Sequence, residues 1–316
     1  MKGAFITNRY YSDGGLEYTY NSLARAFGKR AHLKRVCPLW SYDKGVQLDF
    51  NSDLIGTYPA ALPRGASAKA DAGPGLCPGI DTGHFDFALF WDKDYFLASA
   101  FKKRGIRVFN EPEVLAVCDD KQKTYAALTG IEIPKTISAP LMYDVNAEED
   151  KEFLGFVAKE LGFPVIVKEN TGSQGRQVNK ADDMNALREI YLKLRRIPHH
   201  YQAMTGIFGQ DLRVYVVGGE AVAACKRYGT DFRSNLGAGG RMELVNLPKE
   251  YRDVAESVAR QLKLDYGSVD FLIADKPIFL EANSNAYFMG IEGLGVRIAE
   301  PLAEYVLREM TRIEGR

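Results

Sequence analysis

The most informative stretch of this sequence is Val269-Asp270-Phe271-Leu272-Ile273-Ala274-Asp275-Lys276-Pro277-Ile278-Phe279-Leu280-Glu281-Ala282-Asn283. Two apolar, strand-sized runs flank the turn-forming residues Asp275, Lys276 and Pro277, and this pattern predicts a β-hairpin. If Asp275 and Lys276 form the tip, Asp270 lies directly opposite Glu281, and a four-residue loop about the same point keeps that register. Because side chains alternate along a strand, Asn283 lies on the face of Glu281.

This face of the hairpin has the composition of a metal site. Two carboxylates placed opposite each other, roughly 5 Å apart, repel unless a cation lies between them. With the amide oxygen of Asn283 they offer three hard oxygen ligands, a set that suits Mg²⁺ shared with substrate phosphates, or Mn²⁺ as an alternative. An edge hairpin can also carry an Asp–Glu pair on its solvated face without any function. The hairpin alone leaves both interpretations open.

The sequence around the hairpin mixes helices and strands. The spacing of apolar side chains, with glycines after several of the segments, predicts helices at residues 120–128, 148–161, 182–195, 249–262 and 296–308. Strands are expected at residues 165–168, 212–217 and 221–227, the last two joined by the turn Gly218-Gly219. Residues 131–136 are expected to be extended, because Pro134 disfavours helix before it.

The first 118 residues follow a different pattern. Strands are expected at residues 4–7, 85–91 and 106–109, with helices at 16–27 and 95–103. This β-α-β order favours a parallel sheet. Residues 41–83 are rich in Gly, Pro and Ala and form either a long excursion near a site or a mobile loop. Tyr10, Tyr11 and residues 56–83 could line an acceptor pocket or lie at the surface.

The composition excludes several classes of protein. The 316 residues include 41 Lys and Arg and 41 Asp and Glu, so no net charge favours nucleic acid or an anionic membrane as a partner. The longest apolar runs are strand-sized and too short to span a bilayer. Four widely spaced cysteines predict free thiols and a cytoplasmic location. Residues 313–316 match a protease site commonly used to remove tags, and we treat them as an appended sequence.

A glycine-rich turn follows the strand that ends at Lys168, in the order Gly172-Ser173-Gln174-Gly175-Arg176. Such a turn can wrap phosphates with backbone N–H groups, but it matches neither the Walker A loop nor the dinucleotide fingerprint, and alone it could be a plain turn. Arg213, Arg227 and Arg233 lie near strand ends of the same region. Each is typical of a structural ion pair, whereas together they could neutralise a triphosphate and a carboxylate substrate.

In their order and spacing, these motifs resemble the RimK-type branch of the ATP-grasp ligases. The resemblance covers most of residues 108–305 and rests on Asp119-Asp120-Lys121 with Thr124, Ile133-Pro134-Lys135-Thr136, Phe163-Pro164-Val165-Ile166-Val167-Lys168, Gly172-Ser173-Gln174-Gly175, Gly209-Gln210-Asp211-Leu212-Arg213, Asp231-Phe232-Arg233-Ser234-Asn235, and Asp270 with Glu281-Ala282-Asn283. It implies an α/β pre-ATP-grasp domain with a parallel sheet at residues 1–118, followed by a two-lobed α+β ATP-grasp fold. The lobes, expected at residues 119–204 and 205–312, would clamp a nucleotide.

The resemblance also implies roles for individual residues. The nucleotide-binding residues that it implies are Lys121, Lys168, Gly172, Ser173, Gln174, Gly175, Gln202, Ala203, Met204, Asp211, Arg233, Ser234 and Asn235. Among these, residues 202–204 would follow the adenine edge, although Ala203 stands where relatives usually have Glu. The implied metal ligands are Asp270, Glu281 and Asn283. Charge that develops during the reaction would be stabilised by Arg213, Arg227 and Arg233.

The chemistry implied by the resemblance is a two-step amide synthesis. A substrate carboxylate attacks the γ-phosphate of ATP to give an acyl phosphate and ADP, and an amine then displaces phosphate. Members of this branch add glutamate or another amino acid to a peptide, protein or cofactor, and related ligases often form homo-oligomers. Asn283 is followed by Ser284-Asn285-Ala286-Tyr287, whereas many relatives read Asn-x-Ser-Pro-Gly, so the usual acceptor does not transfer. The alternatives are a small-molecule kinase and an ATP-binding regulator without turnover.

Overall fold

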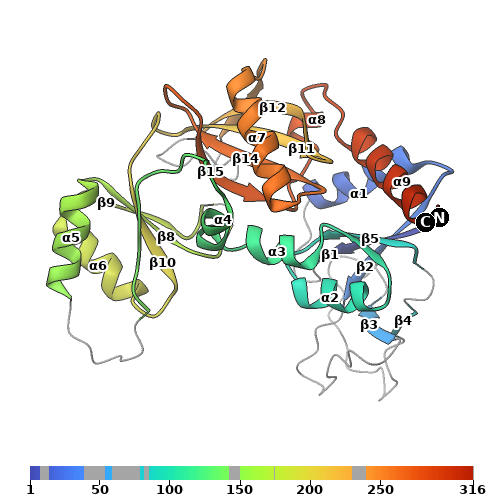
Figure 1. Cartoon of the computed structure of the whole chain (residues 1–316), viewed down its shortest axis with the longest axis horizontal. Coiled ribbons are helices and arrows are strands. Elements are labelled where there is room, and N and C mark those ends of the chain that lie inside the picture. Colours follow the sequence, from blue (N-terminus) through green and yellow to red (C-terminus); the bar gives the residue numbers. More distant parts are fainter. Residues whose placement is uncertain are drawn as a thin grey trace. The chain divides into compact units, whose positions relative to one another are not determined.

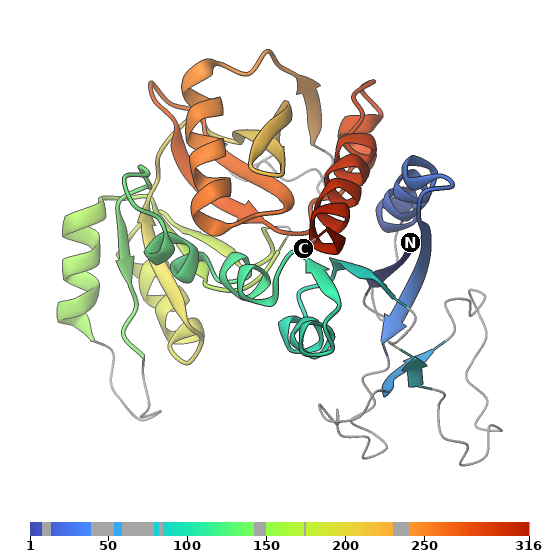
Figure 2. The same cartoon turned by 45° about the vertical axis from the view of Figure 1, so that its right-hand side comes forward.

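The computed structural model describes residues 1–7, 14–38, 54–58, 79–81, 85–141, 150–173, 175–229 and 240–315. The chain forms two compact units, one made of Met1–Leu115 and Asn285–Arg316 and the other of Ala116–Ser284 (Figures 1 and 2). These units are groups of mutual contacts, and the predicted domain limits at residues 118, 204 and 312 stay a prediction. In the described part of the chain, no helix has both the length and the apolar character needed to cross a bilayer.

The first unit is built on a six-stranded sheet in the order β4-β3-β2-β1-β5-β6. Its strands are β1 (Lys2–Thr7), β2 (His32–Pro38), β3 (Leu54–Tyr58), β4 (Gly79–Asp81), β5 (Phe87–Trp91) and β6 (Arg107–Phe109). Strands β2, β1, β5 and β6 run parallel, as predicted, while β3 and β4 pair antiparallel. The sequence did not predict β2, because the charged pair Lys34 and Arg35 interrupts its apolar positions.

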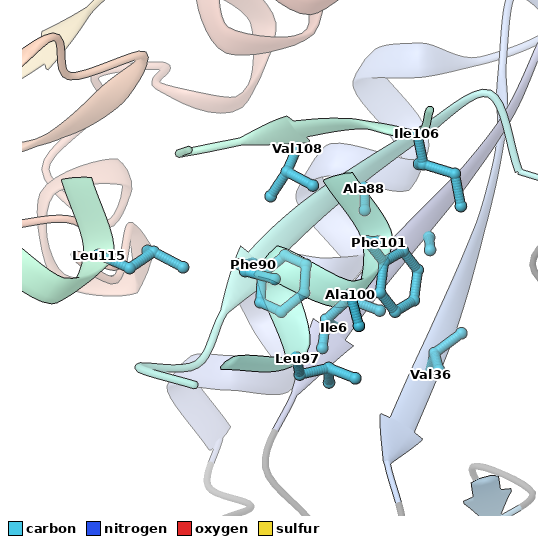
Figure 3. Close-up of a cluster of buried hydrophobic side chains, with 12 residues drawn as sticks. Ile6, Val36, Ala88, Phe90, Leu97, Ala100, Phe101, Ile106, Val108 and Leu115 are labelled. Carbon is cyan, nitrogen blue, oxygen red and sulfur yellow. The ribbon is translucent and has the colours of Figure 1, made fainter. Parts of the chain in front are cut away.

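A compact apolar cluster holds this sheet against helix α2 (Tyr95–Lys103), which the sequence predicted with the same limits. Figure 3 shows Phe90 of β5 beside Leu97 and Phe101 of α2, all almost without exposure. The rings of Phe90 and Phe101 meet edge to face at 5.6 Å between centroids. Burial of each side chain of this size contributes about 1.5–3 kcal/mol to the free energy of unfolding. The cluster therefore stabilises the first unit.

The remaining helices of the first unit are α1 (Gly14–Phe27), α8 (Met289–Glu292) and α9 (Ala299–Glu314), and α3 (Pro112–Cys118) spans the boundary between the units. Helix α9 was predicted at residues 296–308 but starts later, because the Glu292 carboxylate accepts hydrogen bonds from the backbone N–H groups of Ile298 and Ala299. Ile313 and Glu314, from the tag-like end of the sequence, continue this helix. Helices α1 and α9 lie side by side in both views (Figures 1 and 2).

The second unit contains two antiparallel sheets, of which the smaller has the order β7-β10-β8-β9. Its strands are β7 (Thr136–Ser138), β8 (Val165–Glu169), β9 (Val178–Ala181) and β10 (His199–Ala203). Helices α5 (Lys151–Leu161) and α6 (Met184–Leu194) cover one face and bury Val165, Val167 and Tyr201 (Figure 1). Because side chains alternate, the opposite face carries Ile166, Lys168, His200 and Gln202.

The larger sheet has the order β13-β12-β11-β14-β15. Its strands are β11 (Gln210–Val217), β12 (Glu220–Tyr228), β13 (Arg241–Leu244), β14 (Tyr266–Leu272) and β15 (Ile278–Asn283). Helix α7 (Lys249–Leu262) has the limits that the sequence predicted and packs on β11, β12 and β14. The short helix α4 (Lys121–Ala127) contacts α7 and β15.

The register of the β14–β15 hairpin confirms the central prediction and corrects its details. Asp270 pairs with Glu281 and Ser268 pairs with Asn283, so the three predicted metal ligands share one face of the sheet. Beyond Asp270 the register shifts, because Leu280 is an extra residue in a β-bulge. The connecting loop covers residues 273–277, one residue more than the longer of the two predicted loops.

Candidate active site

The second unit has a pocket with walls from both sheets. Its lining combines apolar side chains, a glycine-rich segment and five charged side chains, namely Lys121, Pro134, Ile166, Lys168, Gly172, Ser173, Gly175, Gln177, Val178, Gln202, Ala203, Met204, Thr205, Ile207, Phe208, Gln210, Asp211, Arg227, Leu272, Leu280 and Glu281. A pocket with apolar walls and a few charged groups is suited to a ligand that has a flat apolar part and an anionic part.

Most of the residues predicted to bind nucleotide line this pocket. They are Lys121, Lys168, Gly172, Ser173, Gly175, Gln202, Ala203, Met204 and Asp211, joined by Arg227 and Glu281 from the predicted catalytic and metal sets. Arg213, Asp270 and Asn283 lie next to this lining but are not part of it. Gln174, Arg233, Ser234 and Asn235 fall outside the described residues, as do Tyr10 and Tyr11.

Lys168 is a buried cation. It lies on β8 with 8% of its surface exposed, and burial lowers its pKa to about 8, although the nearby Glu281 carboxylate raises it and Lys121 lowers it further. A lysine that is held in this way gains much from an anion, because a bound phosphate would replace the lost hydration. We therefore expect Lys168 to be the cation most sensitive to ligand binding.

The position of Lys121 is set by a backbone hydrogen bond and by the N-terminal cap of helix α4. The Asp120 side chain caps α4 by accepting from the N–H groups of Gln122 and Lys123, and the N–H of Lys121 donates to the Asn170 carbonyl oxygen at 2.9 Å. The Asn170 side chain in turn contacts Nδ1 of His200 at 3.1 Å. Burial lowers the pKa of His200 to about 3, and the positive charges of Lys168 and Lys121 contribute to this shift. The imidazole near these two lysines is therefore neutral.

The segment after β8 has backbone geometry that only glycine adopts readily. Gly172 has a φ of +132° and Gly175 a φ of +68°. A Cβ atom on Gly172 would lie 2.5 Å from Oε1 of Gln177, so the Gln177 side chain, just before β9, would have to move. The two glycines therefore let the backbone approach the pocket closely, which suits backbone contacts to phosphate oxygens.

Two arginines and two aspartates form a cluster on the face of the larger sheet that helix α7 does not cover. Arg213 donates from Nε to Oδ1 of Asp270 at 2.8 Å and from Nη2 to Oδ2 at 2.6 Å. Arg227 donates from Nε and Nη2 to Asp211 at 2.7 and 2.5 Å, and from Nη2 to Oδ2 of Asp270 at 2.8 Å. Both arginines are thus held by carboxylates, and Arg227 is the one that reaches the pocket lining.

Two of the three residues proposed as metal ligands, Glu281 and Asn283, suit Mg²⁺, whereas both carboxylate oxygens of Asp270 already accept hydrogen bonds from arginines. Glu281 is half-buried and lines the pocket, and the Asn283 amide lies beside it, with Nδ2 3.3 Å from Oε1 of Glu281. Among the described residues, no three His, Cys, Asp and Glu side chains gather into a metal site of their own. A cation here would need the amide oxygen of Asn283 and oxygens from a ligand, which matches the way Mg²⁺ binds through one or two carboxylates plus phosphates.

The sequence did not point to Tyr125 or to the hydrogen-bonding role of Thr136. The Tyr125 hydroxyl donates to the carbonyl oxygen of Leu280 at 2.9 Å, and Nε2 of Gln202 donates to the hydroxyls of Tyr125 and Thr136 at 3.1 and 2.9 Å. Tyr125 therefore links a strand from each sheet. A tyrosine in a short amphipathic helix carries no pattern that reveals such a contact, since its partner lies 155 residues away.

Known proteins are similar to this chain. The RimK-like ATP-grasp domain family matches residues 118–306. N-acetylaspartylglutamate synthase A of Homo sapiens is 30% identical over 223 residues, which are 68% of this chain and 56% of that protein, so the chain spans little more than half the length of this relative. A protein of Xanthomonas euvesicatoria pv. vesicatoria (strain 85-10) named "Probable alpha-L-glutamate ligase" is 27% identical over 313 residues, which are 94% of this chain and 96% of that protein.

The fold has solved counterparts. The structure of D-alanine–D-alanine ligase from Bacillus anthracis complexed with ATP matches with a TM-score of 0.67 and 16% identity, over 100% of this chain and 99% of that chain. At this identity the likeness concerns the fold. Together with the two kinds of sheet described above, it confirms the predicted class, a parallel α/β region joined to a two-sheet α+β region.

Proposed function

This chain belongs to the RimK-like ATP-grasp family, and we propose that it is an ATP- and Mg²⁺-dependent ligase that joins a carboxylate to an amine. The observation that carries the proposal is that one pocket brings apolar, cationic and acidic side chains together. Apolar side chains and Gln202 lie in the same lining as Lys121, Lys168 and Glu281. That combination suits a purine at one part of the pocket and a metal-bound polyphosphate at the other.

In the first proposed step, a carboxylate oxygen of the substrate attacks the γ-phosphorus of ATP, the bond to the β-phosphate oxygen breaks, and ADP leaves. Lys168 and Lys121 would hold the phosphates, and the backbone at Gly172 and Gly175 would cover them. Glu281, Asn283 and Asp270 are the residues that would hold Mg²⁺, and the bound ion would supply positive charge for the phosphates. Because Lys168 is already desolvated in the free protein, its charge would act strongly on the transferred group.

In the second proposed step, an amine nitrogen attacks the acyl carbon and the C–O bond to phosphate breaks. The products are an amide, ADP, phosphate and a proton, so the sequence balances without a covalent enzyme intermediate. Arg227 is the cation of the predicted catalytic trio that lines the pocket within the described residues. Since Asp211 and Asp270 fix its guanidinium, it would stabilise developing negative charge from a set position.

We further propose glutamate as the amine donor. The support is the names of the two relatives above, an N-acetylaspartylglutamate synthase and a probable alpha-L-glutamate ligase. The carboxylate acceptor is left unassigned, because the residues after Asn283 depart from the usual pattern. A cytoplasmic location is proposed from the wide spacing of the four cysteines along the sequence, and a homo-oligomeric state is kept as a proposal.

A purified-enzyme screen tests the ligase. The protein would be incubated with ATP, Mg²⁺, each amino acid and a panel of carboxylates, while ADP release is followed and products are detected by mass. We expect ADP, free phosphate and a condensed product to appear in equal amounts for at least one pair that contains glutamate. A phosphorylated product without free phosphate would instead identify a kinase, and ATP binding without ADP release under every condition would identify a regulator.

A further inference from the structure

The side-chain amide of Gln202 is held in one orientation by two hydroxyl groups. Gln202 is almost fully buried on the pocket-facing side of β10, and its Nε2 donates to Tyr125 at 3.1 Å and to Thr136 at 2.9 Å. A glutamine amide carries two hydrogens on nitrogen and none on oxygen. The orientation of such an amide must be decided by its partners, because oxygen and nitrogen have nearly the same shape.

The two hydroxyls can only accept from Gln202. Each has a single hydrogen, and each has already donated it to a backbone carbonyl oxygen, which can only accept. Tyr125 donates to Leu280 at 2.9 Å, and Thr136 donates to Pro134 at 2.7 Å. If the amide were flipped, its oxygen would face two oxygens with no hydrogen between them, and both contacts would become repulsive.

The amide oxygen of Gln202 is therefore directed away from both hydroxyls, and Gln202 lines the pocket. Among the described residues, no group donates a hydrogen bond to this oxygen. It is a fixed hydrogen-bond acceptor that is left for a ligand. An exocyclic amino group satisfies such an acceptor, whereas a ring carbonyl at the same position would place oxygen against oxygen.

We propose that Tyr125 and Thr136 are positioning residues that make this enzyme selective for 6-aminopurine over 6-oxopurine nucleotides by fixing the acceptor end of Gln202. The inference rests on the proposed function, since it assumes that a purine nucleotide occupies the pocket. Neither residue is part of the pocket lining described above. They act through two chains of hydrogen bonds that run in a fixed direction. In one, Gln202 donates to Thr136 and Thr136 donates to Pro134; in the other, Gln202 donates to Tyr125 and Tyr125 donates to Leu280.

The test measures nucleotide binding rather than ligation. Dissociation constants for ATP and ITP would be measured by calorimetry with the full chain and Mg²⁺; the two nucleotides differ in the group at position 6 of the purine and in the hydrogen that ITP carries on N1. Wild type is expected to bind ATP roughly tenfold or more tightly than ITP, the factor that one repelled buried acceptor produces. Tyr125→Phe and Thr136→Val each remove one hydroxyl and should reduce this ratio, and the double variant should reduce it further than either single variant.

Two matched variants separate selectivity from general damage. Tyr201→Phe removes a buried tyrosine hydroxyl from the opposite face of the same strand, where it contacts Nε2 of His199 at 2.8 Å, and should leave the ratio unchanged. In a Gln202→Glu background both side-chain oxygens accept, so adding Tyr125→Phe should no longer lower the ratio. Circular dichroism would verify that each variant is folded.

Three outcomes would overturn the inference. Tyr125→Phe and Thr136→Val could weaken ATP and ITP binding by the same factor, which would assign both residues a structural role only. Wild type could bind both nucleotides equally, which would remove the selectivity but leave the proposed ligase intact. Wild type that binds neither nucleotide would overturn the proposed function and the inference together.

Discussion

Arg213 and Asp270 face each other across β11 and β14 and form a two-bond ion pair, fork to fork. Burial alone would raise the pKa of Asp270, but the guanidinium groups of Arg213 and Arg227 outweigh burial and hold that pKa below its usual value. The carboxylate is therefore ionised and already balanced by the protein. A cation bound at this face would depend on the charge of Glu281, for which the described residues provide no ion pair within 4.0 Å.

Arg227→Met should destabilise the second unit strongly. The substitution leaves the buried Asp211 carboxylate without its guanidinium and takes one hydrogen bond from Asp270, and an uncompensated buried charge costs about 3–5 kcal/mol of unfolding free energy. Adding Asp211→Asn should restore part of the loss. Urea unfolding followed by circular dichroism measures both effects.

Arg260→Met is the matched surface control, because Arg260 is exposed and lies 3.8 Å from Glu256 within helix α7. Such a pair contributes about 0.5 kcal/mol at most. Equal losses in the Arg227 and Arg260 variants would contradict the expectation that the buried ion pairs contribute more to stability than an exposed pair.

ATP binding should take up protons in alkaline solution. Lys168 has its pKa lowered to about 8 by burial, so above that pH the free protein holds a neutral amine, and phosphate binding should restore the charge. At about pH 8.5 we expect roughly three quarters of a proton per ATP, and almost none at about pH 6.5. Calorimetry in buffers of different ionisation enthalpy measures this number directly.

The same lowered pKa sets the sign of the stability effect. Folding favours the neutral form of Lys168, so its buried charge costs stability below about pH 8, and this cost is relieved as pH rises towards the unfolded pKa of about 10.4. Lys168→Arg keeps a cation that does not lose its proton, and it should bind ATP without the uptake. Identical proton uptake by wild type and Lys168→Arg would assign the effect to another group.

The hairpin shows how far the sequence could predict the site. The pairing of Asp270 with Glu281 was predicted correctly although the loop was not, because the bulge at Leu280 offsets the odd number of residues in the loop. Nothing local to the hairpin predicts that bulge. The carbonyl oxygen of Leu280 accepts a hydrogen bond from Tyr125, and such a contact exists only once the whole unit is folded.

Elements whose signal is local were predicted well, and those that depend on partners were not. Helix α7 has a regular apolar face and was predicted with its observed limits. Strand β10 escaped prediction because His199, His200 and Gln202 make it polar, and partners such as Asn170 for His200 and Thr136 for Gln202 lie far away in the sequence. The ion pairs of Arg213 and Arg227 are likewise set by strand register rather than by sequence spacing.

Glu281→Gln should weaken metal binding at the site, and so raise the Mg²⁺ concentration that activity requires, without changing the shape of the site. The amide keeps the size of the side chain but removes the negative charge that the proposed Mg²⁺ site depends on, so half-maximal ADP release should need roughly tenfold more Mg²⁺. Binding of Mn²⁺ to the ATP complex, followed by electron paramagnetic resonance, gives a readout independent of turnover. Removal of metal with EDTA should abolish ADP release in wild type.

Glu132→Gln is the control for charge, since Glu132 pairs with Lys276 at the exposed end of the same hairpin. It should leave the Mg²⁺ dependence as it is in wild type. An unchanged Mg²⁺ requirement in Glu281→Gln would remove Glu281 from the metal site.

Gly267→Ala should disturb the metal site without touching any of its ligands. A Cβ atom at Gly267 would lie 2.3 Å from the carbonyl oxygen of Asn283, so β15 would have to move away from β14 beside the proposed ligands. We expect a loss of about 1–3 kcal/mol in unfolding free energy, as for other overpacked sites, together with a higher Mg²⁺ requirement. Gly155→Ala is the matched control, because Gly155 lies exposed within α5 with no atom near its Cβ position, and alanine there should be neutral or stabilising by about 0.5–1 kcal/mol. If Gly267→Ala changed stability but left the Mg²⁺ requirement at its wild-type value, the close approach of the two strands would serve packing alone, and the proposed ligand set would not depend on it.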